Sequence, residues 1–281
     1  MNSSQSSNGI RTSLIIFVIA SIIGEVLYIV FTPILAANGA IPATASERLD
    51  QAYLIMYIFT IAAIPVFMFV VVFCGYAIAR WRTRGRPTED GPAISGNSRL
   101  QLAWIVIAIA LAGFLYVVGF QGLAEIEAAS PSNAVHIRVT GEQWLWDYTY
   151  TDPKYRANGG PGVGSTVLEL PINTPIQFTV TSIDVQHSFW LPELGVKEDA
   201  VPGELNTATV TADKLGTYQV RCMELCGVYH SYMNTLAKVV SVSEFNDWVS
   251  SQPQAPASYG VQNLASQSLP PMALVGVGKQ S

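Results

Sequence analysis

The chain has 281 residues, of which 50% are hydrophobic and only 12% are charged. Soluble domains carry about 25% charged residues, so part of this chain is expected to lie in a membrane. The formal net charge is −5 and there is no Lys/Arg run or basic patch, which argues against a nucleic-acid-binding protein. Three cysteines are too few for a disulfide framework.

Three apolar runs each exceed the roughly 20 residues that a helix needs to cross the hydrocarbon core of a membrane. They extend from about Ser13 to Ala37, from about Ala52 to Ala79 and from about Leu102 to Leu123. The second and third runs predict a transmembrane hairpin within residues 50–124. The first run, within residues 1–37, is either an additional transmembrane helix or a signal peptide. Its length exceeds the about 7–15 apolar residues of a signal peptide, which favours the additional helix.

The charges between the apolar runs predict the orientation of the chain. The loop between the second and third runs contains Arg80, Arg82, Arg84, Arg86 and Arg99, against Glu89 and Asp90. By the positive-inside rule this loop is expected to be cytoplasmic, so everything after about Ala124 is expected on the outer face of the cell membrane. Glu25 lies near the middle of the first run and is expected to face another helix, because a carboxylate is costly in lipid.

The sequence changes character within residues 125–250, where turn signals separate short runs rich in β-branched and aromatic residues. Seven strands are expected: Val135–Thr140, Trp144–Thr151, Thr166–Leu170, Ile176–Ser182, Thr207–Thr211, Gly216–Cys222 and Leu236–Val242. Such strands over about 110 residues predict a β-sandwich or Greek-key barrel, and therefore a membrane-anchored all-β fold. A short closing helix is expected at Ser243–Val249, and residues 251–281, rich in Pro, Ser, Gln and Gly, are expected to form an extended tail.

A dense group of possible metal ligands lies near the end of the β-rich region: Cys222, Glu224, Cys226, His230 and Met233. Thiolate, imidazole and thioether together select copper over magnesium, calcium or manganese. One Cys with one or two His and a weak Met would make a mononuclear blue-copper site, whereas two cysteines on one loop can bridge a pair of coppers. His187 follows a predicted strand and is expected to supply a second imidazole.

Two plainer interpretations use fewer of these side chains. Cys222 and Cys226 can form a disulfide outside the cytoplasm, and two Cys with two His can bind zinc. Neither interpretation uses Met233 or Glu224, and five ligand-competent residues within twelve positions favour copper. His136 lies far from any ligand-like neighbour in the sequence and is not expected to bind a metal.

The spacing of these five residues resembles the CuA motif of subunit II of the haem-copper cytochrome c oxidases. Three further segments are similar to the same family: Gly141–Tyr150, His187–Pro192 and Gly195–Gly203. The resemblance covers about residues 50 to 250. It implies a helical hairpin followed by a cupredoxin domain.

The resemblance also implies a role for each residue of the motif. Both cysteines would bridge two copper ions. His187 and Met233 would complete one copper, while His230 and the backbone carbonyl of Glu224 would complete the other. Trp144 would be the point where electrons enter from cytochrome c; the alternative is an ordinary core or rim packing residue.

The implied function is electron transfer within a respiratory oxidase. Cytochrome c would pass electrons through CuA to haem in subunit I, where O2 is reduced to water with coupled proton pumping. The haems would belong only to the partner subunit, and the Glu224 side chain would help to hold magnesium at the interface with subunit I. Subunit III and membrane lipid are further implied partners. The chain lacks a Cys-x-x-Cys-His haem-attachment sequence, so the donor is expected to be a separate protein.

Acidic residues predominate in the part of the chain that would meet the donor. From Ala124 onward there are fifteen Asp or Glu and eight Lys or Arg, a net charge of −7. This excess would attract a basic donor, and Asp147, Asp152 and Asp184 are candidate docking residues.

One position departs from the family pattern. Gln101 stands where many members carry a Glu that marks the mouth of a proton channel, and Gln cannot ionise, which counts against proton uptake by that route. Two other functions compete with an oxidase subunit II that binds CuA. Subunit II of a quinol oxidase shares the fold but normally lacks the copper ligands. A free-standing membrane cupredoxin for copper or electron carriage would have no use for the Glu224 carboxylate.

Overall fold

The computed structural model describes residues 3–81, 96–156 and 160–255. The chain divides into two compact units, one ending at Ala128 and the other beginning at Ala129. Several residues used above to predict orientation, Arg82, Arg84, Arg86, Glu89 and Asp90, lie outside the described residues, as does the predicted tail after Ala255.

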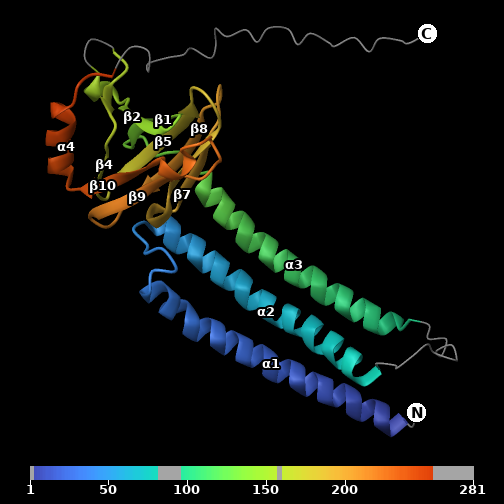
Figure 1. Ribbon diagram of the computed structural model, residues 1–281. Coiled ribbons are helices and arrows are strands. Elements are labelled where there is room, and N and C mark those ends of the chain that lie inside the picture. The colour runs from blue at the N-terminus through green and yellow to red at the C-terminus, as the bar shows by residue number, and fades with distance from the viewer. Residues whose placement is uncertain (1–2, 82–95, 157–159, 256–281) are drawn as a thin grey trace, which may run out of the picture. The chain divides into compact units, whose positions relative to one another are not determined.

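The first unit consists of three long apolar helices: α1 (Ser3–Ala37), α2 (Glu47–Trp81) and α3 (Ser98–Ile126) (Figure 1). Each is long and apolar enough to cross a membrane, with mean hydropathy between 2.5 and 2.7 over the candidate span. The Asn97 side chain caps α3 by accepting hydrogen bonds from the backbone N–H groups of Arg99 and Leu100. This cap explains why α3 begins four residues before the predicted apolar run. The three predicted helices are confirmed.

Aromatic and small side chains pack α1 against α2. The Phe17 ring meets the Phe69 ring edge-on with centroids 5.8 Å apart, and the Tyr28 and Tyr57 rings stack at 5.5 Å. At Gly24 an added Cβ would lie 2.9 Å from a methyl carbon of Ile64, so the absent side chain allows close approach of the two helices. The first helix therefore has specific partners within its own unit.

The second unit contains two five-stranded sheets, confirming the predicted β domain. One sheet has the order β3 (Val163–Ser165), β2 (Leu145–Tyr150), β1 (Val135–Glu142), β5 (Pro175–Ser182), β8 (Asn206–Thr211). The other has the order β4 (Leu168–Pro171), β10 (Asn234–Val240), β9 (Gly216–Cys222), β6 (His187–Leu191), β7 (Val196–Ala200). The pairs β1–β5 and β4–β10 are parallel, and the other pairs are antiparallel.

Alternation of side chains places the core between the two sheets. Along β5, residues are alternately half-buried and buried, as expected for a strand with one solvated face. The rings of Phe178 on β5 and Phe189 on β6 have centroids 5.3 Å apart and join the sheets at the centre of the domain. The buried Tyr150 hydroxyl adds a polar link, donating to the Glu169 carbonyl at 2.8 Å and accepting from the Glu169 N–H at 2.9 Å.

Three strands were not predicted: β3, β6 and β7. The β3 strand is short and contains Gly164, while β7 begins with the charged sequence Val196-Lys-Glu-Asp. The residues of β6 are nearly all buried and show no polar–apolar alternation. The closing helix α4 spans Val242–Ser251, beginning one residue earlier than predicted because the Ser241 side chain caps it at Glu244 N–H.

Candidate metal centre

Three strand ends bring the candidate ligands together. Strand β9 ends at Cys222, a short 3-10 turn covers His230–Tyr232, and β10 begins directly after Met233. Strand β6 begins at His187 and pairs with β9 through Phe189 opposite Cys222. This pairing brings His187 to the loop although it lies 35 residues before Cys222 in the sequence.

The donor atoms form one cluster. The Sγ atoms of Cys222 and Cys226 lie 3.8 Å apart, well beyond the roughly 2.05 Å of a disulfide bond, and both cysteines are free. His187 Nδ1 is 3.8 Å from Cys222 Sγ, and His230 Nδ1 is 3.5 Å from Cys226 Sγ. Met233 Sδ is 3.8 Å from Cys226 Sγ. Each sulfur of the cysteine pair therefore has an imidazole nitrogen beside it.

Glu224 contributes to this cluster through its backbone. Its carbonyl oxygen lies 3.3 Å from Cys222 Sγ, while its side chain is exposed. A carboxylate is not among the potential metal ligands that group within 4.8 Å in the described part of the chain, namely His187, Cys222 and Cys226. The structure thus gives the carbonyl and the side chain of Glu224 different surroundings.

Four of the five clustered side chains are almost completely removed from solvent, and the fifth, His230, is half-buried. His187 is 0% exposed, Met233 1%, Cys226 3% and Cys222 5%. A buried imidazole needs polar partners, and Asp184 supplies one, with its Oδ1 2.9 Å from His187 Nε2. The carboxylate thereby favours the tautomer with the proton on Nε2 and leaves Nδ1 free to act as a ligand.

Hydrogen bonding also shifts the pKa values of His187 and Asp184. Burial by itself would lower the pKa of His187, but its hydrogen bonds with Cys222 and Asp184 outweigh burial and raise it. Burial would raise the pKa of Asp184, yet hydrogen bonds from His187 and from the N–H groups of Val185 and Gln143 lower it. The carboxylate therefore stays ionised beside the ring and holds its orientation.

The two thiols have different acidities. Burial would raise the pKa of Cys222, but hydrogen bonds with His187, the backbone at Ser188 and Glu224, and His230 lower it to about 6. Burial and the neighbouring Cys222 raise the pKa of Cys226 to about 11. Two thiolates this close repel each other, so a cation between them would favour loss of both protons.

The donor set fits copper better than zinc. Structural zinc takes four donors, which two Cys and two His would supply in full. The buried thioether of Met233 would then have no role beside the cluster. Thiolate, imidazole and thioether donors are those of copper electron-transfer sites, and two adjacent cysteines offer enough donors for more than one ion.

The turn between β1 and β2, formed by Gln143 and Trp144, supports the ligand loop. The Gln143 side chain donates a hydrogen bond to the Cys226 carbonyl at 2.6 Å. Gly227 has φ +123°, and a Cβ there would lie 3.0 Å from Gln143 Nε2 and 3.3 Å from Trp144 Cζ2. Trp144 is half-buried and meets Tyr229 edge-on, with ring centroids 4.8 Å apart. Thus Trp144 lies beside the ligand loop but outside the donor cluster.

Two polar residues have roles that the sequence did not predict. Asp184 was expected only as a docking residue, yet its carboxylate binds His187, and the signal available was its position three residues before that ligand. Gln143 adjoins Trp144 in the sequence but gave no signal of its bond to Cys226. Asp152 was expected to be a docking residue for a basic donor. That expectation was wrong, because Asp152 is only 8% exposed and its carboxylate accepts a hydrogen bond from His136 N–H.

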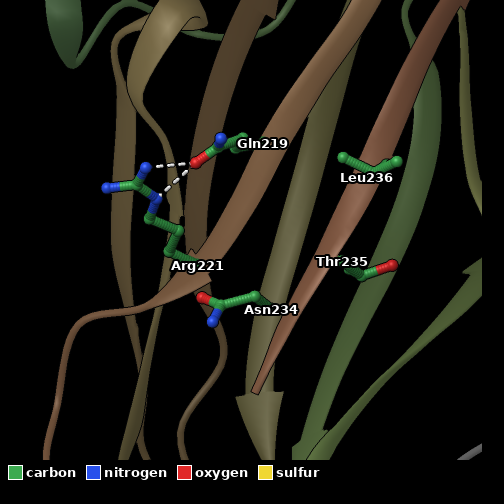
Figure 2. A pocket seen from close by; sticks show the side chains of 5 residues that line it. All are labelled: Gln219, Arg221, Asn234, Thr235 and Leu236. Atoms are coloured by element: carbon green, nitrogen blue, oxygen red, sulfur yellow. Dashed lines mark hydrogen bonds between the residues drawn. The ribbon is translucent and has the colours of Figure 1, made fainter. Parts of the chain in front are cut away.

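A separate open pocket of about 520 Å³ lies on the outer side of the ligand strands, lined by Gln219, Arg221, Asn234, Thr235 and Leu236 (Figure 2). Arg221 precedes Cys222, and Asn234 follows Met233. Because side chains alternate along a strand, these two polar residues face away from the buried ligands. Figure 2 shows the Arg221 guanidinium donating a hydrogen bond to the side-chain amide oxygen Oε1 of Gln219. The pocket is therefore distinct from the metal centre.

Removing the Asp184 carboxylate tests how the buried imidazole is held. Asp184→Ala leaves His187 Nε2 without this acceptor, and loss of such a partner typically weakens metal binding about 10- to 100-fold. We expect faster copper loss to a chelator, measured on the purified full chain. Asp247→Ala removes an exposed carboxylate on α4 and should leave copper retention unchanged. Equal retention in the two variants would contradict this role for Asp184.

Comparison with known proteins gives the family. Residues 163–240 match the family described as "Cytochrome C oxidase subunit II, periplasmic domain". The chain is 31% identical over 242 residues to cytochrome c oxidase subunit 2 of Cereibacter sphaeroides, covering 74% of this chain and 76% of that one. It is 27% identical over 288 residues to the corresponding protein of Synechocystis sp., covering 85% and 83%.

A solved structure of the periplasmic domain of subunit II of cytochrome oxidase from Bradyrhizobium japonicum is 34% identical, covering 43% of this chain and 95% of that one with a TM-score of 0.37. The matches to full-length relatives extend over both units of the chain. With its three candidate membrane spans, its periplasmic domain and its CuA-type group of His187, Cys222, Cys226 and Met233, the chain belongs to the cytochrome c oxidase subunit II family.

Proposed function

We propose that this subunit of a haem-copper oxidase receives electrons from cytochrome c and passes them to haem in subunit I, where O2 is reduced to water with coupled proton pumping. The observation that carries the proposal is the cluster of two thiols, two imidazoles and a thioether, of which all but the His230 imidazole are buried. Haem belongs to the partner subunit in this proposal. No oxygen chemistry is assigned to the chain itself.

Six residues hold two copper ions in the proposed centre. Cys222 and Cys226 contribute to both ions, His187 and Met233 to one, and His230 with the Glu224 carbonyl to the other. The distances from each sulfur to its neighbouring imidazole support this assignment. Two copper ions held by these residues would supply one-electron transfer.

The surrounding residues keep the ligands in place. Cys222 and Met233 are joined by a backbone hydrogen bond of 3.1 Å, and Asp184 fixes His187. Burial of the four inner ligands excludes water from the cluster. A set of ligands held by strands and hydrogen bonds needs little rearrangement when the charge at the site changes.

Trp144 is the proposed point where electrons enter. Its ring lies against Gly227 and Tyr229 of the ligand loop. Leu225 is 78% exposed and Val228 84% exposed on the same loop, an apolar surface suited to a protein partner. A donor in contact with Trp144 would therefore be separated from the ligand Cys226 only by the Trp144 ring and Gly227.

Carboxylates near Trp144 support a basic donor such as cytochrome c. Burial, followed by the neighbouring charges of Asp147 and Asp184, raises the pKa of Glu142. This mutual influence indicates three acidic groups close together, whose combined negative potential would speed the encounter with a basic protein.

Magnesium is proposed at the exposed Glu224 carboxylate, completed by ligands from subunit I. Its support is the contrast between the carbonyl, 3.3 Å from Cys222 Sγ, and the exposed side chain of the same residue. A carboxylate and several waters or partner oxygens are suitable for Mg²⁺.

The proposed domain division assigns residues 1–37 to a first membrane helix, 50–124 to a helical hairpin, 125–250 to the copper domain and 251–281 to a tail. Retention of the first helix is supported by its aromatic and glycine contacts with α2. Lipid, subunit I and subunit III are the proposed partners of the helices.

The central test is the copper spectrum of the purified oxidase. An electron shared equally by two copper nuclei gives a seven-line electron paramagnetic resonance pattern, whereas one copper gives four lines. We expect the seven-line pattern, and we expect haem-containing subunits to co-purify with this chain. A four-line pattern would contradict the two-copper centre, and isolation without haem proteins would contradict the oxidase assignment.

Substitution of Trp144 separates electron input from copper binding. Trp144→Phe should slow electron transfer from reduced cytochrome c because the donor loses its contact residue, while the copper spectrum stays unchanged. Stopped-flow reduction of the complex measures both. Trp248→Phe on α4 is the matched control and should transfer electrons at the wild-type rate. Unchanged transfer in Trp144→Phe would overturn the assignment.

Manganese can report on the proposed magnesium site, since Mn²⁺ accepts similar oxygen ligands and is visible by electron paramagnetic resonance. The wild-type complex grown with manganese should show one bound Mn²⁺ signal that Glu224→Gln weakens. The Glu204→Gln variant removes another exposed carboxylate and should keep the signal. Retention of Mn²⁺ in Glu224→Gln would show that this side chain is not a ligand.

The intact mass of the subunit tests whether the first helix is retained. We expect the subunit from the purified complex to include residues 1–37, because α1 has specific packing partners on α2. Top-down mass spectrometry measures this directly. A subunit that begins after Ala37 would assign the segment to a signal peptide.

A further inference from the structure

We propose that Gly141 and Trp146 form a cradle that sets the orientation of the His187 imidazole and thereby tunes the copper centre. The proposal rests on the proposed function only in taking His187 as a copper ligand. Neither residue is a ligand itself. Both act through the position of the ring, so they are positioning residues.

Trp146 holds one side of the imidazole. It lies on β2, is 3% exposed, and meets the His187 ring edge-on with centroids 5.8 Å apart at 64°. The same indole packs on Phe189 at 5.5 Å and 74°. Its buried Nε1 has no hydrogen-bond partner among the described residues, so packing alone fixes the indole beside the ligand.

Gly141 supplies the space that the imidazole occupies. It lies on β1 directly opposite Trp146 in the sheet register. A Cβ at this position would lie 2.9 Å from His187 Cδ2, 3.1 Å from His187 Cγ and 3.1 Å from Trp146 Cζ3. Gly141 does not have a positive φ, so its backbone would accept another residue. Glycine is required here for steric reasons, because the His187 ring occupies the space that a side chain at position 141 would fill.

The cradle complements the hydrogen bond from Asp184. That bond fixes Nε2 of the imidazole at 2.9 Å but leaves the ring able to tilt about the bonded atom. The Trp146 ring, which meets the imidazole edge-on, opposes this tilt, while the absent side chain of Gly141 leaves the room that Cγ and Cδ2 occupy. A hydrogen bond of 3.2 Å from Ile183 N–H to the Gly141 carbonyl ties the loop before His187 to the same strand. Together these contacts fix where Nδ1 points.

The orientation of Nδ1 has a predictable electronic consequence. A nitrogen donor stabilises the oxidised state of copper more than the reduced state, so a misaligned imidazole should raise the reduction potential. It should also make the two copper positions unequal, since only one has His187 beside it. These two properties distinguish a positioning role from simple packing in the core.

The test compares variants of the full oxidase complex. Trp146→Leu and Trp146→Phe alter the cradle, and Gly141→Ala fills its space. Phe178→Leu is the matched control, because Phe178 is also fully buried and also packs on Phe189, at 5.3 Å, and it is not one of the proposed ligands or cradle residues. Each complex is measured for its melting temperature, copper retention against a chelator, copper reduction potential and paramagnetic resonance pattern.

We expect Trp146→Leu and Gly141→Ala to lose copper about tenfold faster, as when an outer partner of a metal ligand is removed. Both should raise the potential and replace the equal hyperfine pattern by an unequal one, with Trp146→Phe shifted less in the same direction. Phe178→Leu should lower the melting temperature while keeping the wild-type potential and spectrum.

A wild-type spectrum and potential in Trp146→Phe and Gly141→Ala, or the same shifts in Phe178→Leu, would overturn the cradle. If Trp146→Leu does not assemble, Trp146→Phe decides, because it keeps an aromatic ring in the core. The wild-type complex tests the proposed function separately: a four-line spectrum would contradict the two-copper centre, while copper retention in the variants would still test the cradle.

Discussion

The short pairing between β6 and β9 is the contact on which the metal centre depends. It consists of two registered pairs, Phe189 with Cys222 and Trp190 with Arg221, and is extended by a hydrogen bond of 2.9 Å from Met223 N–H to the Ser188 carbonyl. This pairing brings His187 close to the loop that carries Cys222 and Cys226. Because the pairing closes a long stretch of chain, its cost in conformational entropy must be met by the core behind it.

That core is built around one phenylalanine. The Phe189 ring contacts aromatic rings on two strands of the opposite sheet: Trp146 and Tyr148 on β2, and Phe178 on β5. His187 lies two residues before Phe189 in β6, and therefore on the same face of the strand, so the residue that anchors the strand also positions the ligand. Fold stability and the placement of His187 therefore both depend on the Phe189 side chain.

Sequence patterns pointed clearly to the candidate metal ligands but not to the strand and the carboxylate that position them. Cys222, Cys226 and Met233 lie within one short segment, where soft donors at close spacing are informative without any knowledge of the fold. The long apolar helices were equally clear, since length and hydropathy are local properties. Strand β6 was missed because a strand buried on both faces lacks the alternation that reveals a half-solvated one. The partnership of Asp184 with His187 likewise depends on a loop conformation that spacing does not specify.

The connection between the two units also limits how the copper domain can operate. Helix α3 ends at Ile126 and β1 begins at Val135, so eight residues join them. Even fully extended, such a tether spans only about 28 Å. Because the linker is short, the copper domain stays close to the membrane. Its effective concentration near a membrane-bound acceptor is therefore high and does not depend on the amount of protein present. In the proposed function, electron transfer to subunit I then takes place within one assembled complex, and only the arrival of the donor depends on diffusion.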